Sequence, residues 1–126
     1  MIKLNPYAKL DLEMTTYAVA SIYIYGYNGG RWIFKRDSQT YSLDGKGKVT
    51  VLGQYDSPEV SVKVASLICS QIAINQLAWK AAESGANAQV KLWNDYYYQF
   101  RELLWSDENP LKLSQSDKDA IYSVCE

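Results

Sequence analysis

The chain has 126 residues, 48% of them hydrophobic, with 13 basic and 14 acidic side chains and a net charge of −1. This length fits one domain with one hydrophobic core, over residues 1–126, and the composition excludes an intrinsically disordered chain. The near balance of charge argues against a large basic surface for nucleic acid and equally against a strongly acidic mimic of DNA.

Residues 8–25 fit two patterns. An alternation typical of a strand runs through Tyr17, Val19, Ser21, Tyr23, Tyr25 and Tyr27. A spacing typical of a helix runs through Leu10, Met14, Tyr17, Ser21 and Tyr25. Tyrosine, isoleucine and valine favour the strand locally, so the residues alone leave both structures open.

The stretch YIYGYNGGRWIF, residues 23–34, concentrates aromatic side chains around a turn. Asn28, Gly29 and Gly30 tolerate left-handed backbone conformations, which predicts a sharp reversal of the chain there. We interpret the stretch as a folding junction, in which the tyrosines before Gly26 pack on a sheet.

Residues 31–55 predict three short antiparallel strands. The first contains Trp32 and Phe34 on one face, residues 40–43 return after a polar turn, and residues 48–52 form the third. Asp44 and Gly45 provide the second turn.

A long apolar helix is predicted over residues 58–84. Ser57 is expected to cap its N-terminus, Pro58 suits the first helical position, and Gly85 ends it. Because most of its faces are apolar, we expect this helix to be buried on several sides.

Two further helices follow. Asn87 is expected to cap the first, and Asn109-Pro110 breaks it. Its apolar stripe consists of Leu92, Trp93, Tyr96, Phe100, Leu103 and Leu104. Ser114 caps the last helix, with Asp117 in its first turn. The predicted architecture is α+β: one small three-stranded antiparallel sheet packed against about four helices.

The sequence offers no catalytic constellation. Histidine is absent, and the two cysteines, Cys69 and Cys125, form no CxxC pair, so we expect no metal site, no cofactor and no hydrolase triad. The carboxylate pairs at residues 107–108 and 117/119 lie in polar segments, where solvated surface is the simpler interpretation. We therefore expect no enzymatic activity.

No membrane segment is expected either. The first 14 residues lack the apolar core of a signal peptide. Residues 60–82 are the most apolar segment, but a bilayer span would have to bury Lys63, Gln71, Asn75, Gln76 and Lys80. We expect a cytoplasmic protein.

The C-terminal third is the best candidate for a partner-binding surface. Residues 92–126 carry three basic and seven acidic side chains, a charge of −4, which can steer a basic partner. Tyr96 belongs to the apolar stripe, so at least one of Tyr97 and Tyr98 should point outward; the alternative is that both pack against neighbouring elements. The candidate residues are Asp95, Tyr97, Tyr98, Glu102, Asp107 and Glu108.

The order of these motifs resembles the ArdB/KlcA antirestriction family of plasmids and other mobile elements. The shared features are the Tyr27-Asn28-Gly29-Gly30 junction before Trp32, a strand hairpin, a serine- and acid-rich start to a long apolar helix, and the ending Ala120-Ile121-Tyr122. The similarity covers roughly residues 13–124. It implies a helix, not a strand, before the junction.

The resemblance also implies a function: protection of incoming DNA from type I restriction, without enzymatic activity. Our leading hypothesis is that the protein acts by contact with a protein partner, the restriction enzyme complex. Two other hypotheses stay open. One is an immunity-type inhibitor of a toxin or another nucleic-acid enzyme. The other is direct DNA binding through the basic N-terminal half, where residues 1–63 carry a charge of +2.

Overall fold

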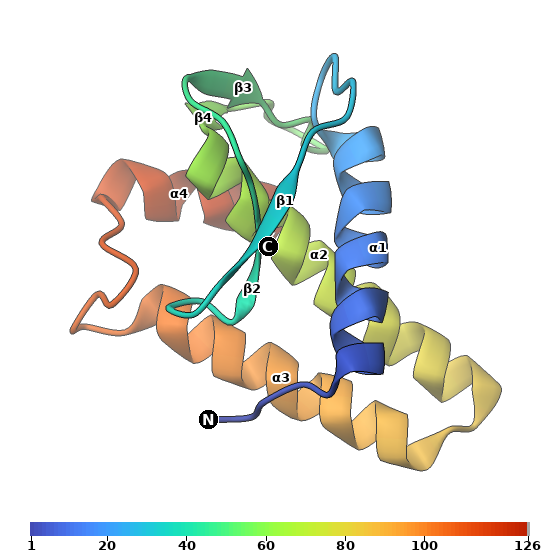
Figure 1. The fold of residues 1–126 in the computed structure, drawn as a ribbon. Helices are drawn as coiled ribbons and strands as arrows, with labels where there is room; N and C mark the ends of the chain where they lie inside the picture. Colours follow the sequence, from blue (N-terminus) through green and yellow to red (C-terminus); the bar gives the residue numbers. More distant parts are fainter. Residues whose placement is uncertain (126) are drawn as a thin grey trace.

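The computed structural model describes residues 1–125, and within them the fold is α+β (Figure 1). Four helices and two separate two-stranded antiparallel sheets are present in these residues. The helices are α1 (Pro6–Tyr23), α2 (Val62–Ser84), α3 (Asn87–Trp105) and α4 (Gln115–Cys125). The strands are β1 (Trp32–Lys35), β2 (Thr40–Leu43), β3 (Lys48–Thr50) and β4 (Glu59–Ser61).

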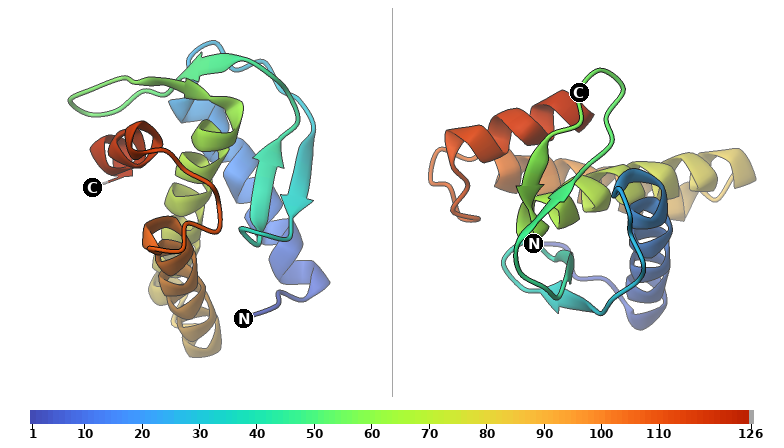
Figure 2. Two further views of the ribbon diagram at one scale, coloured as in Figure 1. Left: turned by 90° about the vertical axis from the view of Figure 1, so that its left-hand side faces the viewer. Right: turned by 90° about the horizontal axis from the view of Figure 1, so that it is seen from above.

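Helix α2 is the centre of the fold, as its sequence predicts. Fourteen of its 23 residues are buried, which requires neighbours on several sides. In Figure 2, α1 and the β1–β2 hairpin lie on one side of α2, and α3 and α4 lie on the other.

The N-terminal segment is a helix, as the family resemblance implies. Asn5 begins it: the side-chain oxygen accepts a hydrogen bond from the Ala8 backbone N–H at 2.9 Å, and Pro6 follows. Leu12 and Val19 are buried in the common core, so tertiary packing overrides the local strand preference. Tyr25 lies beyond the helix and is 74% exposed, so the expectation that it packs on a sheet was wrong.

The β1–β2 hairpin forms as predicted, with Trp32 opposite Leu43 and Phe34 opposite Tyr41. Two serines one turn apart on α2 attach it to the core. The Leu43 backbone N–H donates to Ser66 Oγ at 2.9 Å, and Ser70 Oγ donates to the Tyr41 carbonyl at 3.3 Å. These short side chains let β2 lie directly on an otherwise apolar helix.

The expectation of a single three-stranded sheet was wrong. β3 pairs with β4, not with β2, and forms a second sheet with Val49 opposite Val60. On its other side, the Tyr25 N–H donates to the Thr50 carbonyl at 2.9 Å and the Leu52 N–H donates to the Tyr23 carbonyl at 2.7 Å. Residues 48–52 therefore lie between β4 and the end of α1, which satisfies both edges of this segment.

Two of the predicted N-caps were also wrong. Because residues 59–61 form β4, α2 begins later than expected, and Ser61, not Ser57, caps it by accepting from the Val64 N–H at 3.2 Å. Helix α3 begins one residue early, so Asn87 is its first residue and Ala86 stands at the cap with no side-chain hydrogen bond.

Two helix-boundary predictions are confirmed. Gly85 ends α2 in the left-handed conformation at φ 73°, which glycine adopts without a steric penalty. Ser114 and Asp117 cap α4 reciprocally: each side-chain oxygen accepts a hydrogen bond from the other residue's backbone N–H at 3.0 Å.

Candidate protein-binding surface

The aromatic junction at residues 23–34 is a packing feature. Trp32 Nε1 donates a hydrogen bond to Tyr27 Oη at 2.9 Å, and the Tyr17 and Tyr27 rings meet edge to face at 5.6 Å between centroids. Burial is the main cause that raises the pKa of Tyr27 above its ordinary value. Tyr27 thus lies between Tyr17 of α1 and Trp32 of β1, and the indole N–H of Trp32 is satisfied internally.

The outer face of α3 carries three of the candidate residues. Asp95, Tyr98 and Glu102 are exposed and recur at steps of three and four, so they form one strip along the helix. Lys91 pairs with Asp95 at 2.9 Å, and this hydrogen bond raises the Lys91 pKa. Being exposed, the pair contributes little to stability, and Asp95 stays available at the surface.

The two tyrosines differ in their surroundings. Tyr98 is 69% exposed, which confirms that at least one of them points outward, whereas Tyr97 is half-buried. Arg101 Nη1 donates to Tyr97 Oη at 3.3 Å, and the two tyrosine rings meet edge to face at 5.8 Å. Tyr97 therefore supports the ring of Tyr98 from the side.

Asp107 and Glu108 are exposed in the turn that follows α3. The Glu108 backbone N–H donates to Ser106 Oγ at 3.2 Å. Behind them, the Asn109 side chain bonds both backbone polar groups of Leu113, at 2.7 and 2.9 Å. Five of the six candidate residues are thus exposed on α3 or in its C-terminal turn, and we call these five, Asp95, Tyr98, Glu102, Asp107 and Glu108, the α3 acidic face.

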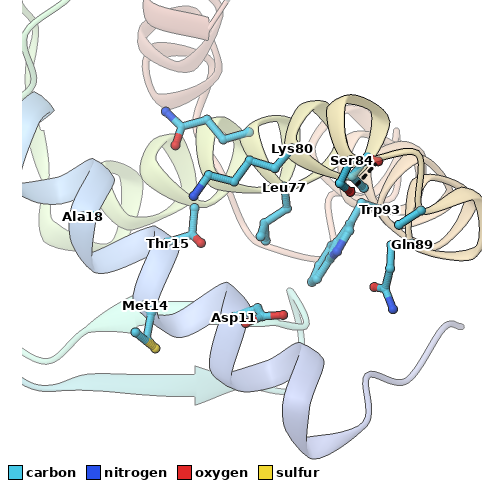
Figure 3. A pocket seen from close by; sticks show the side chains of 12 residues that line it. Asp11, Met14, Thr15, Ala18, Leu77, Lys80, Ser84, Gln89 and Trp93 are labelled. Atoms are coloured by element: carbon cyan, nitrogen blue, oxygen red, sulfur yellow. Dashed lines mark hydrogen bonds between the residues drawn. The ribbon is translucent and has the colours of Figure 1, made fainter.

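A groove of about 620 Å³ lies between α1, the second half of α2 and the start of α3 (Figure 3). Leu77 and Trp93, both nearly buried, contribute apolar surface to it. Asp11 on α1 and Lys80 on α2 are its charged side chains. Sequence reasoning missed this groove because its lining comes from three elements far apart in the chain.

The charged side chains of the groove are one carboxylate and one amine, on different helices. They form neither a pair of carboxylates for acid–base catalysis nor a nucleophile with an adjacent base.

The Cys69 thiol is a poor nucleophile, because burial is the main cause that raises its pKa to about 12. Over residues 1–125, no three side chains of His, Cys, Asp or Glu gather in a way that could hold a metal ion.

No helix in the described part of the chain is long and apolar enough to cross a bilayer. Comparisons with protein-family models, curated proteins and solved structures found no match to this chain. The resemblance to the ArdB/KlcA family therefore depends on the order of motifs described above.

Proposed function

We propose that this chain is a non-catalytic antirestriction protein that protects incoming mobile-element DNA by binding a type I restriction enzyme in the cytoplasm. The order of motifs in the sequence suggests the target, a type I restriction enzyme. The α3 acidic face is the single observation that supports binding to a protein. An enzyme that handles DNA has a basic surface, and an exposed acidic strip complements it.

The composition of the α3 acidic face suits this role. Tyr98 offers a rigid ring that a partner can cover, and tyrosine is enriched among residues that contribute most to binding. Asp95 and Glu102 lie on either side of it and supply the charge that attracts and orients the partner.

The plating efficiency of unmodified phage on cells with a type I system tests the proposal. Expression of the protein should raise plating towards that on cells without restriction. Tyr98→Ala combined with Glu102→Lys should abolish the protection. Tyr122→Ala combined with Glu83→Lys is the matched control, because Tyr122 is 63% exposed on α4 and Glu83 is exposed on α2.

Unchanged plating with well-expressed wild-type protein would contradict the antirestriction function. The α3 acidic face equally fits a basic toxin or another nuclease, which is the alternative function. Purification of the partner bound to wild-type protein but not to Tyr98→Ala/Glu102→Lys separates the two targets.

A further inference from the structure

A second pocket lies between the end of α1, the middle of α2, α3 and the last turn of α4. Its volume is about 300 Å³, at the lower limit of pockets that bind small molecules. Among the described residues it shares only Gln76 with the groove of Figure 3. Five of the eight described residues that line it end in an amide or a phenol, and we call these five the amide–phenol pocket: Tyr23, Gln71, Asn75, Gln76 and Tyr97.

Gln71 is the most buried polar residue of this pocket. It is 3% exposed, and its Oε1 accepts no hydrogen bond from any residue that the structure describes. A buried carbonyl oxygen without a donor is costly, so such atoms are nearly always hydrogen-bonded. Because the side chain of Gln71 lines the pocket, a ligand bound there can provide the donor.

The lining favours an uncharged ligand. None of the described residues that line the pocket carries a charge. An ammonium or phosphate group would lose hydration there without gaining a counter-charge from the lining. A neutral N–H group satisfies Gln71 Oε1 without this cost.

The lining also favours a flat ring with hydrogen-bonding groups on its edge. In Figure 2, α1 and α3 lie on opposite sides of α2, so Tyr23 and Tyr97 reach the pocket from either side of the α2 amides. Tyrosine rings offer faces on which nucleobases stack. A glutamine or asparagine amide pairs with the edge of adenine, because it accepts from the 6-amino group and donates to a ring nitrogen.

We propose that the amide–phenol pocket binds an adenine base, whose 6-amino group donates a hydrogen bond to Gln71 Oε1. The amides of Asn75 and Gln76 offer N–H donors for the ring nitrogens, and the rings of Tyr23 and Tyr97 contact the base. A free nucleoside and an unpaired adenine in a DNA strand present the same base, and the experiment below separates these two sources.

Isothermal titration calorimetry of the purified chain tests the proposal. The wild type should bind adenosine at about 1 mM or below. Purine riboside, which lacks only the 6-amino group, should bind about tenfold or more weakly, because it offers Gln71 Oε1 no donor. Gln71→Leu has a similar shape without the amide, so it should bind both nucleosides equally weakly.

A variant at an exposed position guards against misfolding. Asn75 is exposed on α2, and Asn75→Ala should weaken adenosine binding several-fold. Asn94→Ala is the matched control, because Asn94 is exposed on α3 and does not line the pocket. Circular dichroism should show the same helix content in all of these variants.

No binding of adenosine by the wild type at about 1 mM would mean that solvent alone meets Gln71, and would overturn the proposal. Equal binding of adenosine and purine riboside would overturn it too, since the 6-amino group would then have no partner. Equal effects of Asn75→Ala and Asn94→Ala would place binding elsewhere.

Titration with a short deoxyadenosine oligonucleotide separates the two sources of the base. Tighter binding of the oligonucleotide than of adenosine assigns the pocket to a DNA strand, and weaker binding assigns it to the free nucleoside; both results support an adenine pocket. The assay contains no restriction enzyme, so its outcome is independent of the antirestriction function.

Discussion

Ser66 joins the central helix to the hairpin: its Oγ accepts from the Leu43 backbone N–H at 2.9 Å and donates to the Val62 carbonyl at 2.8 Å. Ser66 is 1% exposed, whereas Leu43 is only partly buried. Ser66→Ala should lower the free energy of unfolding by about 0.5–1.5 kcal/mol, the net contribution of a typical hydrogen bond.

Urea denaturation followed by circular dichroism measures this loss. Ser123→Ala is the control, because Ser123 is exposed on α4 and its Oγ bonds only the Ala120 carbonyl of its own helix. That change should stay within about 0.5 kcal/mol. Equal stability of the two variants would show that Ser66 does not hold the hairpin.

Gly53 allows a close approach of the backbone in the loop between β3 and β4. A Cβ at this position would lie 2.1 Å from the Asp56 carbonyl oxygen, which is main chain and cannot rotate away. Gly53→Ala should therefore destabilise the protein by about 1–3 kcal/mol in urea denaturation. Gly45→Ala, where nothing lies within 4 Å, should be neutral or slightly stabilising. A Gly53→Ala variant as stable as Gly45→Ala would contradict this close approach of Gly53 to Asp56.

Much of this fold could be predicted from the sequence because its signals are local. Gly85, and Ser114 with Asp117, mark helix ends through bonds within one turn. The second sheet could not be predicted, because residues 59–61 resemble a helix start and pair instead with β3. The helical state of α1 depends on burial of Leu12 against residues distant in the sequence. Local propensity does not reflect such burial, so it could not predict this helix.

The candidate surface, too, could be predicted from the sequence only in part. Asp95, Tyr98 and Glu102 could be predicted, because their spacing places them together once the segment is a helix. The role of Tyr97 as a lateral support could not, since it depends on Arg101 and on nearby packing. The groove between α1 and α2 required the tertiary arrangement.

Cys69 should make stability depend on alkaline pH. Its thiol pKa is raised from 9.0 to about 12, first by burial and then by the nearby Cys125. Above pH 9 the unfolded chain loses this proton while the folded chain keeps it, so the free energy of unfolding falls as pH rises towards 12. The stabilisation is fully present below pH 9.

Urea denaturation in reducing buffer between pH 9 and 12 measures the slope of the free energy of unfolding against pH. Cys69→Ala should reduce this slope by up to about 1.4 kcal/mol per pH unit, the contribution of one proton. Cys125→Ala, at a half-buried position, should keep most of the wild-type slope. Identical slopes in all three proteins would mean that the Cys69 thiol ionises in the folded state.

Tyr98 should matter for binding and not for folding. It is 69% exposed, and its ring contact is with Tyr97 alone among the described aromatic pairs. Tyr98→Ala should change the free energy of unfolding by less than about 0.5 kcal/mol in urea denaturation. Phe100→Ala, on the same helix but at a position that is 1% exposed, should cost about 3–5 kcal/mol. A large loss of stability in Tyr98→Ala would assign this residue to the core.

The affinity of the purified chain for a purified type I restriction enzyme tests the central claim most directly. Biolayer interferometry at low and high salt should show binding that weakens with salt. Glu102→Lys should weaken binding by about tenfold or more, while Glu83→Lys leaves it unchanged. No binding at low salt, or equal binding by both charge-reversal variants, would contradict an antirestriction protein that acts through the α3 acidic face.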